Sequence, residues 1–188
     1  MKQEHTREAS EVLLPEYYDV AMGFPVILRE SVIEVRRPDG EKGIIIPDLA
    51  GLEAAMAVAR VSVPAKLTGP EIKFLRKAMA LKAAALAKFL DVTAETLSRW
   101  ENGREPISTN AERLLRLRVL NTLRDRAPGV VVTAGDVLEL KFLPVRLAHE
   151  TALVFERVLV LSGSEIKEAW FFKGVNRDQA AVRQKHIA

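Results

Sequence analysis

The outer positions of a short segment near the middle of the chain carry side chains that can donate a hydrogen bond, accept one or offer a methyl group. They surround two apolar residues, Leu97 and Trp100, which are three positions apart and so share one face of a helix. The outer residues are Ala94, Glu95, Thr96, Ser98 and Arg99. Such a mixture suits the edges of nucleotide bases, where donors, acceptors and methyl groups distinguish one base pair from another.

For most of these side chains we consider two roles, a contact with a base and an ordinary solvated or structural role. Arg99 could donate two parallel bonds to O6 and N7 of guanine, or it could simply be solvated. Glu95 could accept from N4 of cytosine, or it could only favour the positive end of a helix dipole. Ala94 can offer a methyl contact to thymine, whereas Thr96 and Ser98 could make small polar contacts or face water.

Two short helices joined by a tight turn are expected to position these side chains, over residues 81–104. Asp91 and Val92 form the turn, and Thr93 supplies the oxygen that caps the second helix. Gly103 ends that helix, because glycine readily takes the positive φ found just past a helix. The apolar face of the first helix consists of Leu86, Ala87 and Leu90.

Two further helices flank this pair. Thr68 and Glu71 have the spacing of a capping box, and Ser108 caps a long helix that is expected to run to about Arg126. In the earlier helix we expect Ile72, Leu75 and Met79 to face inward and Lys73, Arg76 and Lys77 to face outward. In the long helix we expect Leu114, Leu117 and Leu120 or Asn121 to face inward and Arg113, Arg116, Arg118 and Arg124 to face outward.

The helical segment resembles the helix-turn-helix of the Cro/repressor (XRE) superfamily, a lambda-repressor-like fold. The run LSRWENGREPIS, followed by NAERLLRL, is similar to the C-terminal half of MqsA-type antitoxins and their zinc-less relatives. The resemblance is close over about residues 67–120. It implies binding to double-stranded DNA by a homodimer on a palindromic operator, with Thr93, Asn102 and Arg104 at positions that contact phosphate.

The chain departs from the family pattern at the start of the first helix of the motif. Lys82 and Ala83 stand where the family usually has Ser and Gln. Lys82 could replace the lost phosphate contact as a point charge, although lysine is a poor helix cap. The zinc-binding cysteines of MqsA-type proteins are also missing, so an apolar core must hold the N-terminal part.

The sequence thus predicts an α+β protein in three parts. Residues 1–65 form an acidic unit in which strands at 26–28, 32–36 and 43–47 make a hairpin and Asp48 caps a helix over 49–61. Residues 66–126 form the helical DNA-binding domain. In residues 127–188, a hairpin is expected from 152–161 and 166–172, whereas 130–142 could form strands or a short helix capped by Thr133 and Asp136. This last part could serve in dimerisation.

The charge is unevenly distributed among the three parts. The formal net charge is −4 for residues 1–65, +6 for 66–126 and +1 for 127–188. The positive charge therefore lies in the segment with the helix-turn-helix, as a phosphate-facing surface requires. The leading hypothesis is a sequence-specific transcriptional regulator. The alternative is an antitoxin whose acidic N-terminal unit blocks a protein toxin.

Several other classes of function find no support in the sequence. The absence of cysteine excludes disulfides and thiolate zinc sites and fits a cytoplasmic protein. His149 and Glu150 lack the second histidine of an HExxH zinc site, and His5 and His186 are far away in the chain. Neither a phosphate-cradling glycine loop nor an apolar stretch long enough for a membrane span is present. We therefore expect neither catalysis, nor a metal ion, nor a cofactor.

Overall fold

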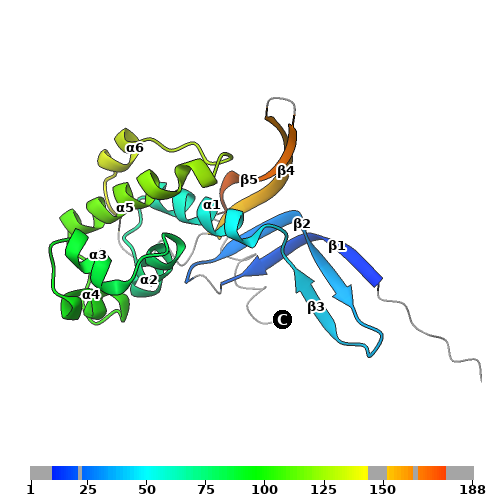
Figure 1. Ribbon diagram of the computed structural model, residues 1–188, viewed down its shortest axis with the longest axis horizontal. Helices are drawn as coiled ribbons and strands as arrows, with labels where there is room; N and C mark the ends of the chain where they lie inside the picture. The colour runs from blue at the N-terminus through cyan, green and yellow to red at the C-terminus, as the bar shows by residue number, and fades with distance from the viewer. Residues whose placement is uncertain (1–9, 21–22, 144–151, 163–164, 177–188) are drawn as a thin grey trace, which may run out of the picture.

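The computed structural model describes residues 10–20, 23–143, 152–162 and 165–176. Five described strands form one mixed sheet, and a group of helices lies beside it (Figure 1). The strands are β1 (Ser10–Asp19), β2 (Val26–Arg36), β3 (Lys42–Ile45), β4 (Ala152–Ser162) and β5 (Glu165–Asn176). The helices are α1 (Leu49–Ser62), α2 (Gly69–Ala78), α3 (Ala83–Phe89), α4 (Ala94–Glu101), α5 (Thr109–Leu123), the 3₁₀ helix η1 (Arg124–Arg126) and α6 (Ala134–Leu138). The predicted α+β class is confirmed.

The sheet joins the two ends of the chain. The order is β1-β2-β4-β5, with β3 also paired to β2. β2 pairs in parallel with β4 over Val26–Arg29, while its second half pairs antiparallel with β3. The predicted helical part, residues 66–126, is called the helical segment below. It is inserted in the chain between β2 and β4, which lie next to each other in the sheet. The first and third predicted parts therefore share one sheet.

Two features of the sheet differ from expectation. β1 was not predicted, because its sequence SEVLLPEYYD mixes charged and apolar residues without strict alternation. The two predicted pieces at 26–28 and 32–36 are one strand, interrupted by Glu30 in a left-handed conformation (φ 48°). The C-terminal hairpin is confirmed as β4 and β5, although part of its predicted turn, residues 162–164, lies outside the described residues.

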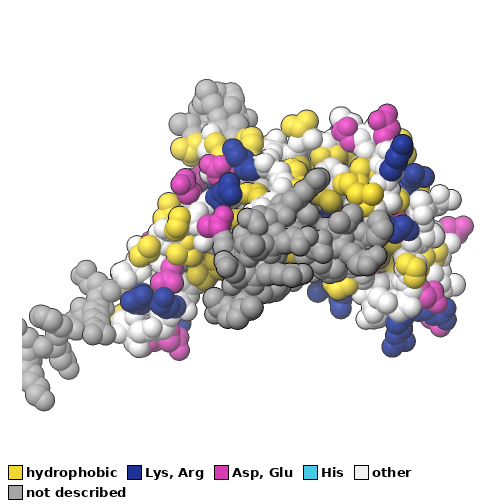
Figure 2. All heavy atoms as spheres, turned by 180° about the vertical axis from the view of Figure 1, so that it is seen from behind, with side chains coloured by type: hydrophobic (Ala, Val, Ile, Leu, Met, Phe, Trp, Pro, Cys, Tyr) yellow, Lys and Arg dark blue, Asp and Glu magenta, His cyan; other side chains and the backbone are white. Residues whose placement is uncertain are grey.

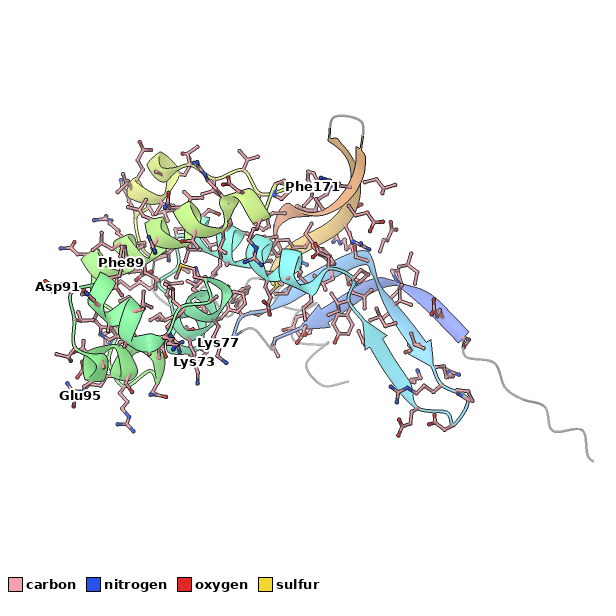
Figure 3. All side chains as sticks on the ribbon, viewed as in Figure 1. Lys73, Lys77, Phe89, Asp91, Glu95 and Phe171 are labelled. Atoms are coloured by element: carbon pink, nitrogen blue, oxygen red, sulfur yellow. The ribbon has the colours of Figure 1, made fainter. Side chains whose placement is uncertain are left out.

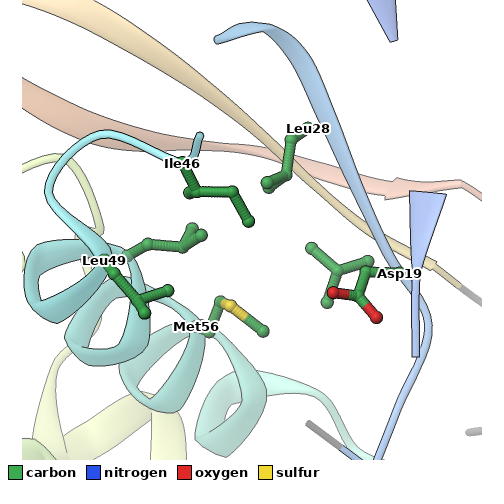
Figure 4. Close-up of a pocket in the computed structure, with 7 residues that line it drawn as sticks. Asp19, Leu28, Ile46, Leu49 and Met56 are labelled. Atoms are coloured by element: carbon green, nitrogen blue, oxygen red, sulfur yellow. The ribbon is translucent and has the colours of Figure 1, made fainter. Parts of the chain in front are cut away.

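Helix α1 lies between the sheet and the other helices (Figure 1). Asp48 caps it by accepting from the Gly51 N–H, and nearly all of its second half is buried. One continuous apolar cluster includes β2, α1 and the helical segment. A cavity of about 20 Å³ between α1 and β2 has room for no more than a water molecule (Figure 4). Its lining is apolar apart from Asp19.

Four buried charged residues tie the helical segment to α1. We call Arg60, Glu71, Glu112 and Arg116 the ionic cluster; each is at most 2% exposed. The Arg60 Nε donates to Glu71 at 2.5 Å, which links α1 to α2. Arg116 Nη2 donates to Glu112 at 2.7 Å, one turn earlier on α5. The first contact joins α1 to α2, whereas the second lies within α5. A buried charge that lost its partner would be strongly destabilising, so both pairs help to hold the packing of these helices.

Arg116 also holds the chain that connects α1 to α2. Its guanidinium donates to the carbonyl oxygens of Val61, Val63 and Ala65 at 2.9, 2.6 and 2.7 Å. Burial, followed by the charge of Arg60, lowers the pKa of Arg116 to about 10, so the side chain is still protonated at pH 7. The segment between α1 and α2 is thus fastened by hydrogen bonds to α5.

The long helix α5 corrects two predictions. Arg116 was expected to face solvent, but it is fully buried, and Leu114 was expected to face inward, but it is 46% exposed. The inward face follows Ala111, Leu115 and Val119, which recur every fourth residue, so it is rotated from the predicted stripe. Asn121 is exposed, Leu117 is half-buried and Leu120 is buried.

The segment left open between strand and helix, residues 130–142, contains the short helix α6. Thr133 and Asp136 form its capping box, with each side chain accepting from the other residue's backbone N–H. Just before it, Gly129 packs so tightly against β5 that an added Cβ would lie 2.3 Å from the Trp170 carbonyl oxygen. This contact fastens the end of the helical segment to the sheet.

Candidate nucleic-acid interface

Helices α3 and α4 form the predicted helix-turn-helix. Residues Leu86 and Leu97 are fully buried where the two helices meet. Asp91 takes a left-handed conformation (φ 55°), and the Val92 N–H donates to the Ala87 carbonyl at 3.0 Å, which closes the turn. Thr93 caps α4 by accepting from the Thr96 N–H at 3.1 Å. The predicted turn, cap and apolar faces are confirmed.

The C-terminal end of α4 is anchored from two sides. Trp100 is 5% exposed, and the Glu101 carboxylate accepts two bonds from Arg76 of α2, at 2.6 and 3.0 Å. The hydrogen bonding of Arg76 to the Glu101 carboxylate raises the pKa of Arg76. Arg76 was expected to face solvent, but this pair draws it into a half-buried position. An added Cβ on Gly69 would lie 2.6 Å from the Trp100 carbonyl oxygen, so α2 begins directly against this end.

The residues that follow α4 continue its hydrogen bonding. Asn102 is the C-cap, and its Nδ2 donates to the Ser98 carbonyl at 2.8 Å and to the Ser98 hydroxyl at 3.3 Å. Gly103 has φ 66°, as predicted, and the Arg104 N–H donates to the Arg99 carbonyl at 2.9 Å. The backbone after the helix is therefore well defined where two phosphate candidates, Asn102 and Arg104, lie.

The outer face of α4 has most of its predicted side chains at the surface. Ala94, Glu95 and Ser98 are exposed, whereas Thr96 and Arg99 are half-buried. The Thr96 hydroxyl lies 3.0 Å from that of Thr93, which already serves as the cap. All five candidate base-reading residues belong to one short helix, and its inner side is fixed by the core.

Arg99 has two acidic neighbours within the protein. Its Nη2 donates to Glu95 at 2.5 Å, one turn earlier on α4, and its Nη1 donates to Glu105 at 3.3 Å, in the loop beyond the helix. The hydrogen bond that Arg99 donates to Glu95 is the largest cause of its raised pKa, followed by the charges of Glu95 and Glu105. The guanidinium is thus charged and held at the surface between two carboxylates.

Glu105 was not a candidate in the sequence. It is six positions after Arg99, beyond the reach of one helical turn, and only the reversal at Gly103 brings the two together. The pattern Arg-x₃-Gly-Arg-Glu carries a weak signal for this pair, since a glycine just past a helix reverses the chain. Sequence reasoning alone does not show on which side the loop returns.

Several basic side chains on α2, on α3 and after α4 are exposed. Lys82 is exposed at the N-terminus of α3, where, among the described residues, no side chain caps the first turn. Figure 3 shows Lys73 and Lys77 projecting from α2 on the side of the helical segment that also carries Glu95. Lys88 and Arg104 are exposed as well. In the opposite view, Lys and Arg side chains stand out along the rim of the helical segment (Figure 2).

Comparison with known proteins identifies this same region. Residues 72–117 match a family model described as helix-turn-helix. The match covers most of α2, all of α3 and α4, and the first half of α5. No curated protein and no solved structure matches the chain. None of the described helices is long and apolar enough to cross a membrane.

Proposed function

We propose that this protein is a sequence-specific regulator of transcription that binds double-stranded DNA through α4, as a repressor. The observation that carries the proposal is the fixed position of α4 within a segment that matches the helix-turn-helix family. Leu97, Trp100 and Glu101 hold its inner side, so its outer side faces away from the core, and a major groove admits an α-helix.

The proposed division of roles follows from position along α3 and α4. Base edges are read by the outer residues of α4, and phosphates are held at the helix ends and in the loop. The base-reading residues are Ala94, Glu95, Thr96, Ser98 and Arg99. The phosphate-binding residues are Lys82, Thr93, Asn102 and Arg104. The N-terminus of α4 supports this division, because the helix dipole and the backbone N–H groups at the start of a helix attract phosphate.

The proposal includes a homodimer on a palindromic operator. One helix of this length reaches only a few base pairs, which gives too little discrimination against the rest of a genome. Two copies related by a two-fold axis would place two α4 helices in successive major grooves. Sedimentation of the protein alone and with a selected duplex tests this directly.

Arg99→Ala and Lys82→Ala separate base reading from phosphate binding. We expect Arg99→Ala to cost about 1–3 kcal/mol on a duplex selected by the wild-type protein, and much less on random DNA. Lys82→Ala should weaken both duplexes alike and reduce the slope of log K against log salt by about 1. Gel shifts across a salt series measure both effects. Equal losses on selected and random DNA for Arg99→Ala would contradict its base-reading role.

A second candidate function is that of an antitoxin, for which the part formed by β1, β2 and β3 provides the supporting observation. Leu13, Ile33 and Ile45 lie side by side across these strands, and Leu13 and Ile45 are 57% and 46% exposed. An apolar row at the surface of a segment with net charge −4 suits a basic protein partner.

Co-expression with the product of a neighbouring reading frame tests the second candidate. An antitoxin should restore growth and co-purify with that product, and Leu13→Arg should weaken the complex without altering DNA binding. Failure of the two chains to form a complex would remove this candidate and leave the first one unaffected.

A further inference from the structure

Glu95 and Glu105 surround the side chain best suited to read a base. They occupy donors on both terminal nitrogens of Arg99, at 2.5 and 3.3 Å. All three side chains remain accessible, with exposed fractions of 43% for Arg99, 74% for Glu95 and 49% for Glu105. Water competes for both members of an exposed ion pair, so Arg99 can exchange its partners when DNA arrives.

The charge of this group differs from that of its surroundings. Two carboxylates and one guanidinium give this group a net charge of −1, whereas residues 66–126 as a whole have a net charge of +6. The exposed basic residues there include Lys73, Lys77, Lys82, Lys88 and Arg104. Phosphates would be attracted by these basic residues and repelled by the unpaired charge of the Arg99 group. When DNA contacts Arg99, Glu95 and Glu105, the repulsion between the carboxylates and the phosphates has to be offset by hydrogen bonds to base edges. Phosphates cannot supply these bonds, because they carry no donor for a carboxylate.

We propose that Glu105, together with Glu95, determines specificity by opposing the binding of non-cognate DNA. This inference rests on the proposed function. On random DNA, transfer of Arg99 to a phosphate would leave both carboxylates unpaired beside the negatively charged backbone. On a cognate site, O6 and N7 of guanine take one N–H from each terminal nitrogen of Arg99, while a base amino group, such as N4 of cytosine, donates to Glu95. Each terminal nitrogen of arginine carries two N–H groups, so Arg99 Nη1 can still donate to Glu105 at that site. Glu105 is therefore unpaired, and opposes binding, only on a duplex that draws Arg99 away to a phosphate.

The two carboxylates have different parts in this arrangement. Glu95 lies in the first turn of α4 and can itself face a base, so its loss would remove both repulsion and readout. Glu105 lies beyond the helix and contacts Arg99 from the loop side, so it is a positioning and repelling residue. Glu105→Gln is therefore the sharper substitution, because it removes the charge and keeps the shape.

The experiment compares wild type, Glu105→Gln and the control Glu139→Gln. Glu139 is also an exposed glutamate, and it follows α6, which lies on the far side of α5 from α4 (Figure 1). Each protein is titrated with a random-sequence 20-base-pair duplex and with a duplex that the wild type has selected from a random pool, across a salt series. Thermal unfolding followed by circular dichroism verifies that the three proteins are equally folded.

We expect Glu105→Gln to bind random DNA more tightly, with a salt slope steeper by up to about 0.9, because one opposing charge is removed. Its ratio of selected to random affinity should fall by roughly fivefold, while Glu139→Gln leaves both values unchanged. An unchanged ratio, or a loss of affinity for both duplexes, would overturn the role of Glu105. A wild type that binds no duplex would instead overturn the proposed function, so the two failures are distinguishable.

Discussion

Two glutamate–arginine pairs with the same spacing have different environments in this protein. Glu112 and Arg116 are four residues apart on α5, and both side chains are fully buried. Glu95 and Arg99 are four residues apart on α4, and their side chains are 74% and 43% exposed. The same residue types at the same spacing therefore make a fixed joint in one helix and an exchangeable contact in the other.

The difference comes from the groups that complete each pair. Inside the protein, Arg116 also donates to three backbone carbonyls, and Glu112 accepts from the Leu67 N–H at 3.0 Å. Water cannot replace these partners, so the loss of one leaves a buried charge. At the surface, water competes for both members of the Glu95–Arg99 pair, and salt screens their attraction. The buried pair is therefore structural, whereas the exposed pair leaves its arginine able to bind a ligand.

The largest effect should follow from Glu112→Ala. We expect a loss of about 3–5 kcal/mol in the free energy of unfolding, because Arg116 and the Leu67 N–H would stay buried without their carboxylate. Urea unfolding followed by tryptophan fluorescence and by circular dichroism measures it. Trp100 reports on the helical segment and Trp170 on the sheet, so a transition that splits in two would show that this joint couples them.

A loss below 1 kcal/mol for Glu112→Ala would contradict the comparison, since the buried pair would then behave like an exposed one. The matched control is Glu53→Ala, which removes a half-buried glutamate from α1 away from the ionic cluster. Its effect on unfolding should be small, because α1 keeps both Arg60 and the apolar residues of its buried face.

The sequence predicts the helix-turn-helix well because its signals are local. The Thr93 cap, the spacing of Leu97 and Trp100, and Gly103 all act within a few residues of each other. The capping box at Thr68 and Glu71 is also as predicted. Each of these features depends on backbone geometry that the neighbouring residues alone determine.

The remaining errors concern contacts between distant residues. From the sequence, Arg116 is expected to be solvated like Arg113 and Arg118. Its burial is explained only by the backbone carbonyls before α2 to which it donates hydrogen bonds. The parallel pairing of Val26 with Leu153 likewise cannot be predicted from local sequence patterns, because the whole helical segment separates the two strands in the chain. In the candidate site, the five outer residues follow from helical periodicity, whereas Glu105 requires knowledge of how a loop returns.

The smallest effect on stability should come from Glu95→Ala. We expect a loss of less than about 1 kcal/mol, from the exposed pair and from the favourable position of a carboxylate at the first turn of a helix. The loss should shrink further in 1 M salt, because screening weakens both contributions. Urea unfolding at low and high salt measures this, with Glu105→Ala as the control that affects the same arginine without the helix-dipole contribution. A loss above about 2 kcal/mol that salt does not reduce would show that this pair is structural. Arg99 could then not exchange its carboxylate partners for a base.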